Sequence, residues 1–231
     1  MAYVHLALIV LISYLVGSFP TSIVVGKVFY KKDIRNYGSG NAGGTNAVRV
    51  FGLPTGIAVI LVDILKGILP VLCIANIPNL SRMQQPLLSQ ELTAIIAGSS
   101  AVIGHIWTVF ASFRGGKGVA TAAGMLMVLY PIGFLLTLPA FVIAVAISGI
   151  VSVGSLTVAF VFPAILWTLT FTEILQTAPS LLYFSILIGL LIIFTHRKNI
   201  IRLIHGEEKP LFKKTIKNLF SFIVVLAGSP L

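Results

Sequence analysis

A glycine-rich polar run, YGSGNAGGTNAVR at residues 37–49, lies between two long apolar stretches. Because glycine lacks a Cβ atom, successive backbone N–H groups in such a run can turn toward one anion. Ser39 and Asn41 add side-chain donors for the anion, and their side-chain oxygens are suited to accept hydrogen bonds as caps of a helix expected over 42–51, whose start would face the same anion. The run therefore predicts a phosphate-binding loop. The polar side chains inside the expected helix are Thr45, Asn46 and Arg49.

The spacing of Gly38, Gly40 and Gly43 also matches the G-x-G-x-x-G dinucleotide fingerprint, with Asp63 at 20 residues beyond Gly43. That fingerprint requires a preceding strand within a βαβ unit, whereas an apolar segment of membrane type precedes it here. We therefore exclude a dinucleotide site. The remaining alternative to phosphate binding is an ordinary glycine-rich loop.

A second glycine-rich run, RGGKGVAT at residues 114–121, surrounds a lysine. It is not a P-loop, because Gly118 stands where Ser or Thr must follow the lysine. We expect it to open a helix and to bind phosphate. The alternative is a basic loop that flanks the membrane and holds no ligand. The candidate binding residues are Arg114, Gly115, Gly116, Lys117 and Gly118.

A third polar cluster, HRKN at residues 196–199, follows the last long apolar run. His196 and Asn199 are one helical turn apart, so their side chains share a face. His196 is a candidate general base or phosphate donor, because imidazole changes its protonation near neutral pH. The alternative is a basic helix at the membrane surface. His105 has no comparable polar neighbours in the sequence, and we expect it to serve packing or to lie at the interface.

The composition indicates an integral membrane protein. The chain has 231 residues, 57% hydrophobic and 10% charged, with a mean hydropathy of +1.04. Soluble domains carry about a quarter charged residues. The formal net charge of +10 fits the positive-inside bias of membrane proteins, whereas binding of nucleic acid would require a soluble basic domain. The single cysteine, Cys73, excludes an intrachain disulfide and a cysteine metal site.

The apolar runs predict seven membrane-spanning helices, and the fold class is therefore an all-α membrane bundle. The fourth helix is expected to be short and sheltered, because residues 118–148 are too many for one span and too few for two. Asp63 and Lys66 lie one turn apart inside the second span, as either a structural ion pair or part of the site. The expected spans cover residues 4–25, 54–77, 91–112, 118–130, 131–148, 150–171 and 180–195.

The basic residues orient this bundle. Fourteen of the 16 Lys and Arg residues fall on one predicted side, which indicates an N-terminus outside and a C-terminus in the cytoplasm. All three polar clusters then face the cytoplasm and predict two phosphorylated ligands, one of them a lipid. Residues 1–217 are interpreted as one seven-helix domain. Residues 218–231 form a C-terminal extension with the composition of an interfacial helix or a loose tail.

Three motifs in order carry a family resemblance: GSGNAGGTNAVR (38–49), RGGKGVAT (114–121) and HRKNIIRLIHGEE (196–208). The segments GSFPTSIVVGK (17–27) and DILKG (63–67) are similar as well. The chain resembles the bacterial acyl-phosphate:glycerol-3-phosphate acyltransferases, integral membrane enzymes of phospholipid synthesis. Ala42 and Gly44 depart from the family pattern, which has a branched residue and an alanine there. The resemblance does not extend to residues 211–231.

The resemblance implies that an acyl group moves from acyl phosphate to the sn-1 hydroxyl of glycerol 3-phosphate, giving lysophosphatidic acid and phosphate. It implies no cofactor, no metal and no nucleic acid. It further implies a multi-pass protein of the bacterial inner membrane, with a cytoplasmic active site, membrane lipids as partners and a possible partnership with the enzyme that makes acyl phosphate. The H-x4-D motif of CoA-dependent enzymes is absent, since Val10, Phe110, Ile201 and Pro210 stand five residues after the histidines.

The resemblance and the residue patterns together assign roles. Ser39, Gly40 and Asn41 are expected to hold the phosphate of acyl phosphate, while an apolar groove between helices holds its chain. Thr45 and Asn46 are expected to bridge or orient the substrates, and Lys66 is a further substrate-binding candidate. The residues expected to bind glycerol 3-phosphate are Arg49, Lys117, His196 and Asn199.

Two alternatives remain within this assignment. The hydroxyl proton passes either to the departing phosphate, which we favour, or to His196 as base. A transporter for a phosphorylated metabolite is the alternative function. Transporters commonly show internal repeats and broken helices at the membrane midplane, whereas this sequence shows no repeat and its polar clusters lie at one membrane edge.

Overall fold

The computed structural model describes residues 2–76 and 87–211, and these ranges contain helices and no strand. An all-helical fold is thus confirmed for this part of the chain. Two short 3₁₀ turns, η1 and η3, and a π-helical end of α4, η2, complete the set. The elements in order are α1 (Ala2–Ser18), α2 (Thr21–Tyr30), η1 (Ile34–Asn36), α3 (Gly44–Phe51), α4 (Leu53–Leu69), η2 (Pro70–Ile74), α6 (Gln90–Ile106), η3 (Val109–Ala111), α7 (Val119–Leu129), α8 (Pro131–Ser148), α9 (Val151–Phe171), α10 (Pro179–Thr195) and α11 (Arg197–Ile204).

Five helical segments among the described residues are long and apolar enough to cross a membrane. A sixth qualifies if α10 and α11 count as one span with a 60° bend. The remaining expected span corresponds to α7, an apolar helix of 11 residues that does not qualify by length. The boundaries expected for α8, α9 and α10 agree with the structure to within one residue. The expected extension at 218–231 lies outside the described residues.

The first expected span, 4–25, lies within one candidate span, Ala2–Tyr30, but the helix is interrupted inside it, which the sequence interpretation did not predict. α1 ends at Ser18 and α2 begins at Thr21, because Pro20 has no N–H with which to continue the helical ladder. The backbone carbonyls at the break accept hydrogen bonds from side chains of other elements. Thr108 Oγ1 donates to the Ser18 carbonyl, and Lys66 Nζ donates to the Phe19 carbonyl at 2.5 Å.

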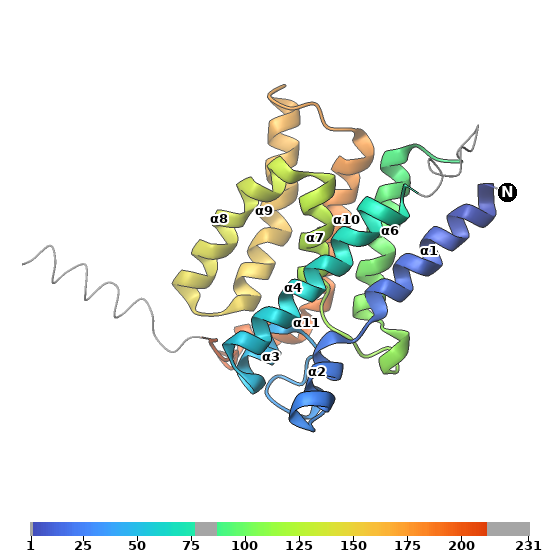
Figure 1. The fold of residues 1–231 in the computed structure, drawn as a ribbon. Coiled ribbons are helices and arrows are strands. Elements are labelled where there is room, and N and C mark those ends of the chain that lie inside the picture. Colours follow the sequence, from blue (N-terminus) through green and yellow to red (C-terminus); the bar gives the residue numbers. More distant parts are fainter. Residues whose placement is uncertain (1, 77–86, 212–231) are drawn as a thin grey trace, which may run out of the picture.

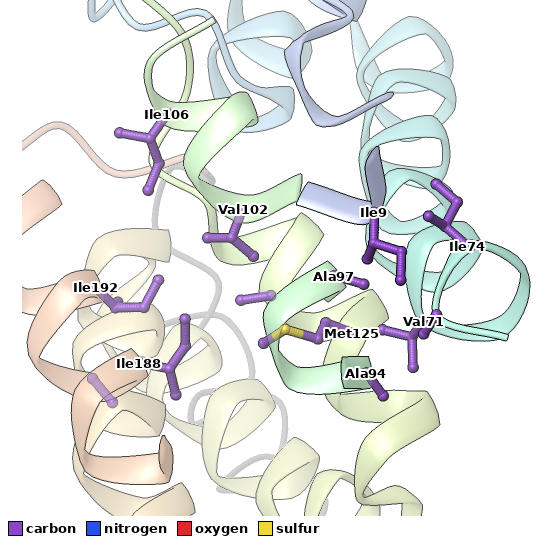
Figure 2. Packing of buried hydrophobic residues seen from close by; sticks show 13 residues of the cluster. Ile9, Val71, Ile74, Ala94, Ala97, Val102, Ile106, Met125, Ile188 and Ile192 are labelled. Carbon is purple, nitrogen blue, oxygen red and sulfur yellow. The ribbon is translucent and has the colours of Figure 1, made fainter. Parts of the chain in front are cut away.

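A buried apolar cluster joins α1, α6, α7, α10 and the π-helical end of α4 (Figure 2). Met125 of α7 is fully buried within it. A Cβ atom on Gly124 would lie 2.0 Å from the Ile64 carbonyl oxygen, so only glycine permits α4 and α7 to pack this closely. The short helix α7 is therefore enclosed by its neighbours, as expected from the sequence.

The elements that carry the polar clusters meet at one end of the molecule. α2, α3 and α11 lie together there, below the α8–α9 pair in Figure 1. α3 carries the end of the first cluster, and α11 carries most of the third. The loop before α7 joins them through a hydrogen bond from Lys117 Nζ to Asn199 Oδ1 at 2.5 Å. Three segments that are far apart in the sequence thus build one site.

Candidate functional site

One cavity of about 380 Å³ connects the three polar clusters with an apolar space between helices α4 and α7–α10. Its polar end is lined by Ser39, Asn41, Thr45, Asn46, Arg49, Lys117, Gly118, His196, Asn199 and Glu208. Its apolar part includes Ile60, Ile64, Leu126, Phe134, Phe162 and Ile188. The sequence-predicted candidates that do not line it are Gly40, Lys66, Arg114, Gly115 and Gly116.

Asn46 holds the first glycine-rich loop from within. Its Oδ1 accepts a hydrogen bond from the Ser39 N–H at 2.9 Å. Its Nδ2 donates to the carbonyls of Tyr37 and Asn41, both at 3.0 Å, and of Ile34 at 3.3 Å. Asn46 is only 1% exposed, so this amide is the internal brace of the loop. Sequence reasoning placed Asn46 at the substrate, whereas the structure engages its polar atoms with the chain.

The backbone of this loop differs from the expected anion nest. Gly38 and Gly40 adopt φ values of +62° and +73°, which favour glycine. However, the Ser39 N–H is taken by Asn46, and the Gly40 N–H donates to the Tyr37 carbonyl at 3.0 Å. The expected donors at these two positions are therefore already paired inside the loop.

Helix α3 begins at Gly44, two residues later than expected, and its N-cap is Gly43. Neither Ser39 nor Asn41 caps it, because a glycine occupies the capping position and no side-chain cap bond forms. The N–H groups of Asn46 and Ala47 donate to the Gly43 carbonyl at 3.1 and 3.0 Å, so the donors that the start of α3 offers beside the cavity are those of Gly44 and Thr45. Gly44 also packs against α4, since a Cβ there would lie 2.2 Å from Ile60 Cγ1.

Lys117 is placed by a loop that other helices hold. The Gly116 N–H donates to the His105 carbonyl and the Gly115 N–H to the Ile106 carbonyl, each at 3.0 Å. Thr195 Oγ1 donates to the Lys117 carbonyl at 3.1 Å. The end of α6 and the end of α10 thus fix the backbone on either side of the lysine.

A chain of hydrogen bonds continues from Lys117 to the third cluster. Asn199 accepts from Lys117 through Oδ1 and donates through Nδ2 to Glu208 Oε1 at 2.6 Å. Arg202 Nε lies 2.5 Å from Glu208 Oε2, and Ser152 Oγ donates to Glu208 at 3.0 Å. Sequence reasoning placed Glu208 in a motif but gave it no role. Its partners could not be foreseen because Ser152 belongs to a distant helix.

Burial lowers the pKa of Lys117 to about 8, with Arg202 and Arg49 acting in the same direction and Glu208 opposing. Burial also raises the pKa of Glu208, but hydrogen bonds from Arg202, Asn199 and Ser152 outweigh this and leave that pKa below its usual value. Near neutral pH the site therefore holds a charged carboxylate and a lysine that is close to its titration point.

His196 is neutral at physiological pH. Burial and the nearby Lys117 lower its pKa to about 4. Its Nδ1 lies 2.8 Å from the Ile192 carbonyl oxygen, which can only accept, so Nδ1 carries the proton. Nε2 then bears a lone pair and can accept a hydrogen bond from a substrate hydroxyl.

Arg49 lies at the rim of the cavity and ties in the chain beyond α11. One of its guanidinium nitrogens donates to the Lys209 carbonyl at 3.1 Å. The same segment is fixed further along, where the Leu211 N–H donates to the Gly149 carbonyl at 2.8 Å. The segment after α11 thus forms one wall of the polar end.

A second buried polar group lies beside the cavity. Asp63 accepts hydrogen bonds from Lys66 at 2.6 Å and Thr21 at 3.0 Å, and His105 Nδ1 lies 3.7 Å away. Of the two alternatives from the sequence, the structure shows the ion pair, with Lys66 directed to Asp63 and the Phe19 carbonyl. Asp63 and His105 line the cavity. His105 was expected to serve packing, because no sequence spacing reveals its approach to Asp63.

The family model for glycerol-3-phosphate acyltransferase matches residues 7–206. A glycerol-3-phosphate acyltransferase of Chlorobium phaeovibrioides is 44% identical over 220 residues, covering 87% of this chain and 94% of that protein. The corresponding protein of Chlorobaculum tepidum is 42% identical over 225 residues, covering 88% of this chain and 95% of that protein.

Two solved structures share the fold. Both are of PlsY (YgiH), an integral membrane glycerol 3-phosphate acyltransferase, and each match covers 93% of this chain and 98% of that chain. The glycerol 3-phosphate form has a TM-score of 0.76 and 31% identity. The lysophosphatidic acid form has a TM-score of 0.74 and 30% identity.

Proposed function

The chain belongs to the glycerol-3-phosphate acyltransferase family, and on that premise we propose that it transfers an acyl group from acyl phosphate to the sn-1 hydroxyl of glycerol 3-phosphate. The products are lysophosphatidic acid and inorganic phosphate. The observation that carries the proposal is the single cavity, which has Arg49 and Lys117 at its polar end and helix side chains along an apolar remainder. This combination suits a phosphorylated acceptor and an amphiphilic donor.

The two phosphate groups are assigned to different parts of the polar end. Arg49, Lys117 and Asn199 bind the phosphate of glycerol 3-phosphate, since both cations line the polar end of the cavity. The head of acyl phosphate lies against Ser39, Thr45 and the free N–H groups at the start of α3. Asn46 supports both by fixing the loop that precedes α3.

The chemistry needs alignment more than a strong base. The acceptor hydroxyl oxygen attacks the acyl carbon, the bond from that carbon to the phosphate oxygen breaks, and phosphate leaves. His196, with a pKa of about 4, is too weak a base to remove the hydroxyl proton at neutral pH. The departing phosphate therefore takes the proton, while Nε2 of His196 orients the hydroxyl. Holding both reactants in line supplies the main rate advantage.

The membrane placement follows from the same premise. Seven helices lie in the bacterial inner membrane, with the N-terminus outside, the C-terminus inside and the polar end of the cavity facing the cytoplasm. α7 crosses together with the neighbours that enclose it. Acyl phosphate reaches the cavity from the lipid phase or from the enzyme that makes it, and glycerol 3-phosphate arrives from the cytoplasm.

One assay tests this proposal against the transporter alternative. Purified protein receives palmitoyl phosphate and labelled glycerol 3-phosphate, and we expect labelled lysophosphatidic acid with release of phosphate. Palmitoyl-CoA in place of palmitoyl phosphate should give no product. Absence of product with every donor would contradict the acyltransferase, and uptake of label into sealed vesicles without acylation would favour a transporter.

A matched pair of variants tests the site itself. Arg49→Ala removes a rim cation and should lower turnover strongly. Lys198→Ala removes an exposed cation from α11. The Lys198 side chain does not line the cavity, so this change should leave turnover near that of the wild type. Equal effects of the two changes would contradict the assignment of the polar end.

A further inference from the structure

The apolar part of the cavity has a definite depth along its two longest walls. On α9 the lining extends from Val151, next to the Ser152 that bonds Glu208 at the polar end, to Pro163, next to Phe162. Twelve residues of α-helix rise about 18 Å. Along α10 the lining extends from Ser185 to the His196 that follows the helix, eleven residues or about 16 Å. Both walls thus give a depth near half of the ~30 Å hydrocarbon core of a bilayer, which is the depth of one leaflet.

A packed cluster lies behind the far end of this space. Tyr130, Phe162, Leu166 and Leu182 form it, and all four are at most 8% exposed. Phe162 is the member that also lines the cavity; the other three do not. The aromatic ring of Phe162 therefore separates the cavity from a region that is already filled.

The cluster behind Phe162 has little room to move. The Tyr130 hydroxyl is hydrogen-bonded to Thr177 Oγ1 at 2.7 Å, which anchors the ring at its far edge. A Cβ atom on Gly133 would lie 2.3 Å from the Tyr130 ring and 2.6 Å from Leu166 Cδ2. Packing this tight does not open without cost to admit further methylene groups.

We propose that Phe162, backed by Tyr130, Leu166 and Leu182, is the floor of the acyl groove and sets the longest acyl chain that the protein uses efficiently. The proposal rests on the function proposed above, because it takes the cavity to hold the chain of an acyl donor. Each methylene that fits above the floor contributes about fourfold in binding, at about 0.8 kcal/mol per buried CH2. A methylene beyond the floor contributes nothing or meets the ring.

The test is a chain-length profile. The full-length protein is assayed with a series of saturated acyl phosphates from decanoyl to eicosanoyl phosphate, and kcat/KM is plotted against length. We expect a rise, a maximum and a fall. Phe162→Ala should move the maximum to longer chains and raise the ratio of long-chain to short-chain kcat/KM about tenfold. Because this ratio is internal to one preparation, it does not depend on how much protein folds.

Two further variants make the test specific. Phe160→Ala removes the same ring from the same helix, but Phe160 is 66% exposed on the outer face, so its profile should match the wild type. Ala159→Leu adds volume to the cavity wall one turn nearer the polar end and should move the maximum to shorter chains. This second change remains informative if Phe162→Ala does not fold.

The outcomes separate the two proposals. A flat wild-type profile would overturn the proposal that Phe162 is the floor of the groove. A maximum that neither Phe162→Ala nor Ala159→Leu displaces would overturn it as well. Either result would indicate that the end of the acyl chain leaves between the helices into lipid. No turnover with any acyl phosphate would instead contradict the proposed function.

Discussion

The two glycine-rich loops of the site have similar compositions but are stabilised in different ways. Residues 38–44 are held from within, by the amide of Asn46 on the helix that follows directly. Residues 114–118 are held from outside, by the carbonyls of His105 and Ile106 and the hydroxyl of Thr195. The first loop is therefore a local unit, whereas the second depends on α6 and α10.

The two loops also provide different groups to the site. The first leads into α3 and presents unpaired helical N–H groups beside the cavity. The second delivers one partly buried cation, Lys117, which is positioned by Asn199 and whose pKa depends on burial and Glu208. Damage to the first loop should thus appear in both stability and activity, and damage to the second mainly in activity.

The largest effect is expected from Lys117→Met, which keeps an apolar stem and removes the ammonium group. Loss of the preorganised charge that holds the phosphate of glycerol 3-phosphate should lower kcat/KM about 10²- to 10³-fold. The melting temperature should change little. Lys198→Met, at an exposed position of α11, is the matched control and should retain activity. A loss below threefold for Lys117→Met would remove the second loop from the site.

Asn46→Asp should be next in size. The carboxylate keeps the shape of the amide but loses the donations to the carbonyls of Tyr37, Asn41 and Ile34. We expect a loss of roughly 2 kcal/mol in stability and about a tenfold lower kcat/KM, because buried acceptors are left unpaired. Thermal unfolding and the acylation assay measure the two. Asn36→Asp, at an exposed position in η1, should show neither change.

Gly116→Ala should have a moderate effect of about tenfold in kcat/KM. A Cβ atom there would lie 2.1 Å from His105 Nε2, so the loop or the ring must move. The double variant Gly116→Ala with His105→Ala removes the clash and should be no less active than His105→Ala alone. If the double variant is less active than His105→Ala alone, the clash with the His105 ring is not the cause of the Gly116→Ala effect.

The smallest effect concerns pH. A lysine with a pKa of about 8 loses its charge as pH rises through 8, so kcat/KM for glycerol 3-phosphate should fall severalfold between pH 7.5 and 9. Glu208 raises the Lys117 pKa, so Glu208→Gln should move this fall to lower pH. Lys117→Arg should lack it. A profile for Lys117→Arg identical to the wild type would assign the titration to the substrate.

The sequence predicted the helices well where composition alone decides them. Apolar runs gave α8, α9 and α10 to within a residue, and Pro131 marked the boundary between α7 and α8. The break at Pro20 was missed, because the surrounding run is apolar throughout and its length suits one span. Its stabilisation comes from Thr108 and Lys66, which are distant in sequence.

The site could be predicted as a set of residues but not as a set of contacts. Glycines, cations and amides at 38–49, 114–118 and 196–199 indicated phosphate chemistry from residue types alone. The roles of Asn46 and His105 depend on which carbonyl or carboxylate each side chain meets after folding. Such partners follow from helix packing, which residue spacing within one segment does not encode.

The short helix α7 has a consequence for how the protein is made. Eleven residues of α-helix extend about 16 Å, roughly half of the ~30 Å hydrocarbon layer. A segment of this length is a poor independent substrate for the insertion machinery. In the proposed seven-helix arrangement, we expect it to be retained because α4 and α6 precede it and offer Ile64 and Val102 as packing partners, and because α8 follows at once. On that arrangement we expect biogenesis to couple insertion to assembly at α7, the helix that begins two residues after Lys117.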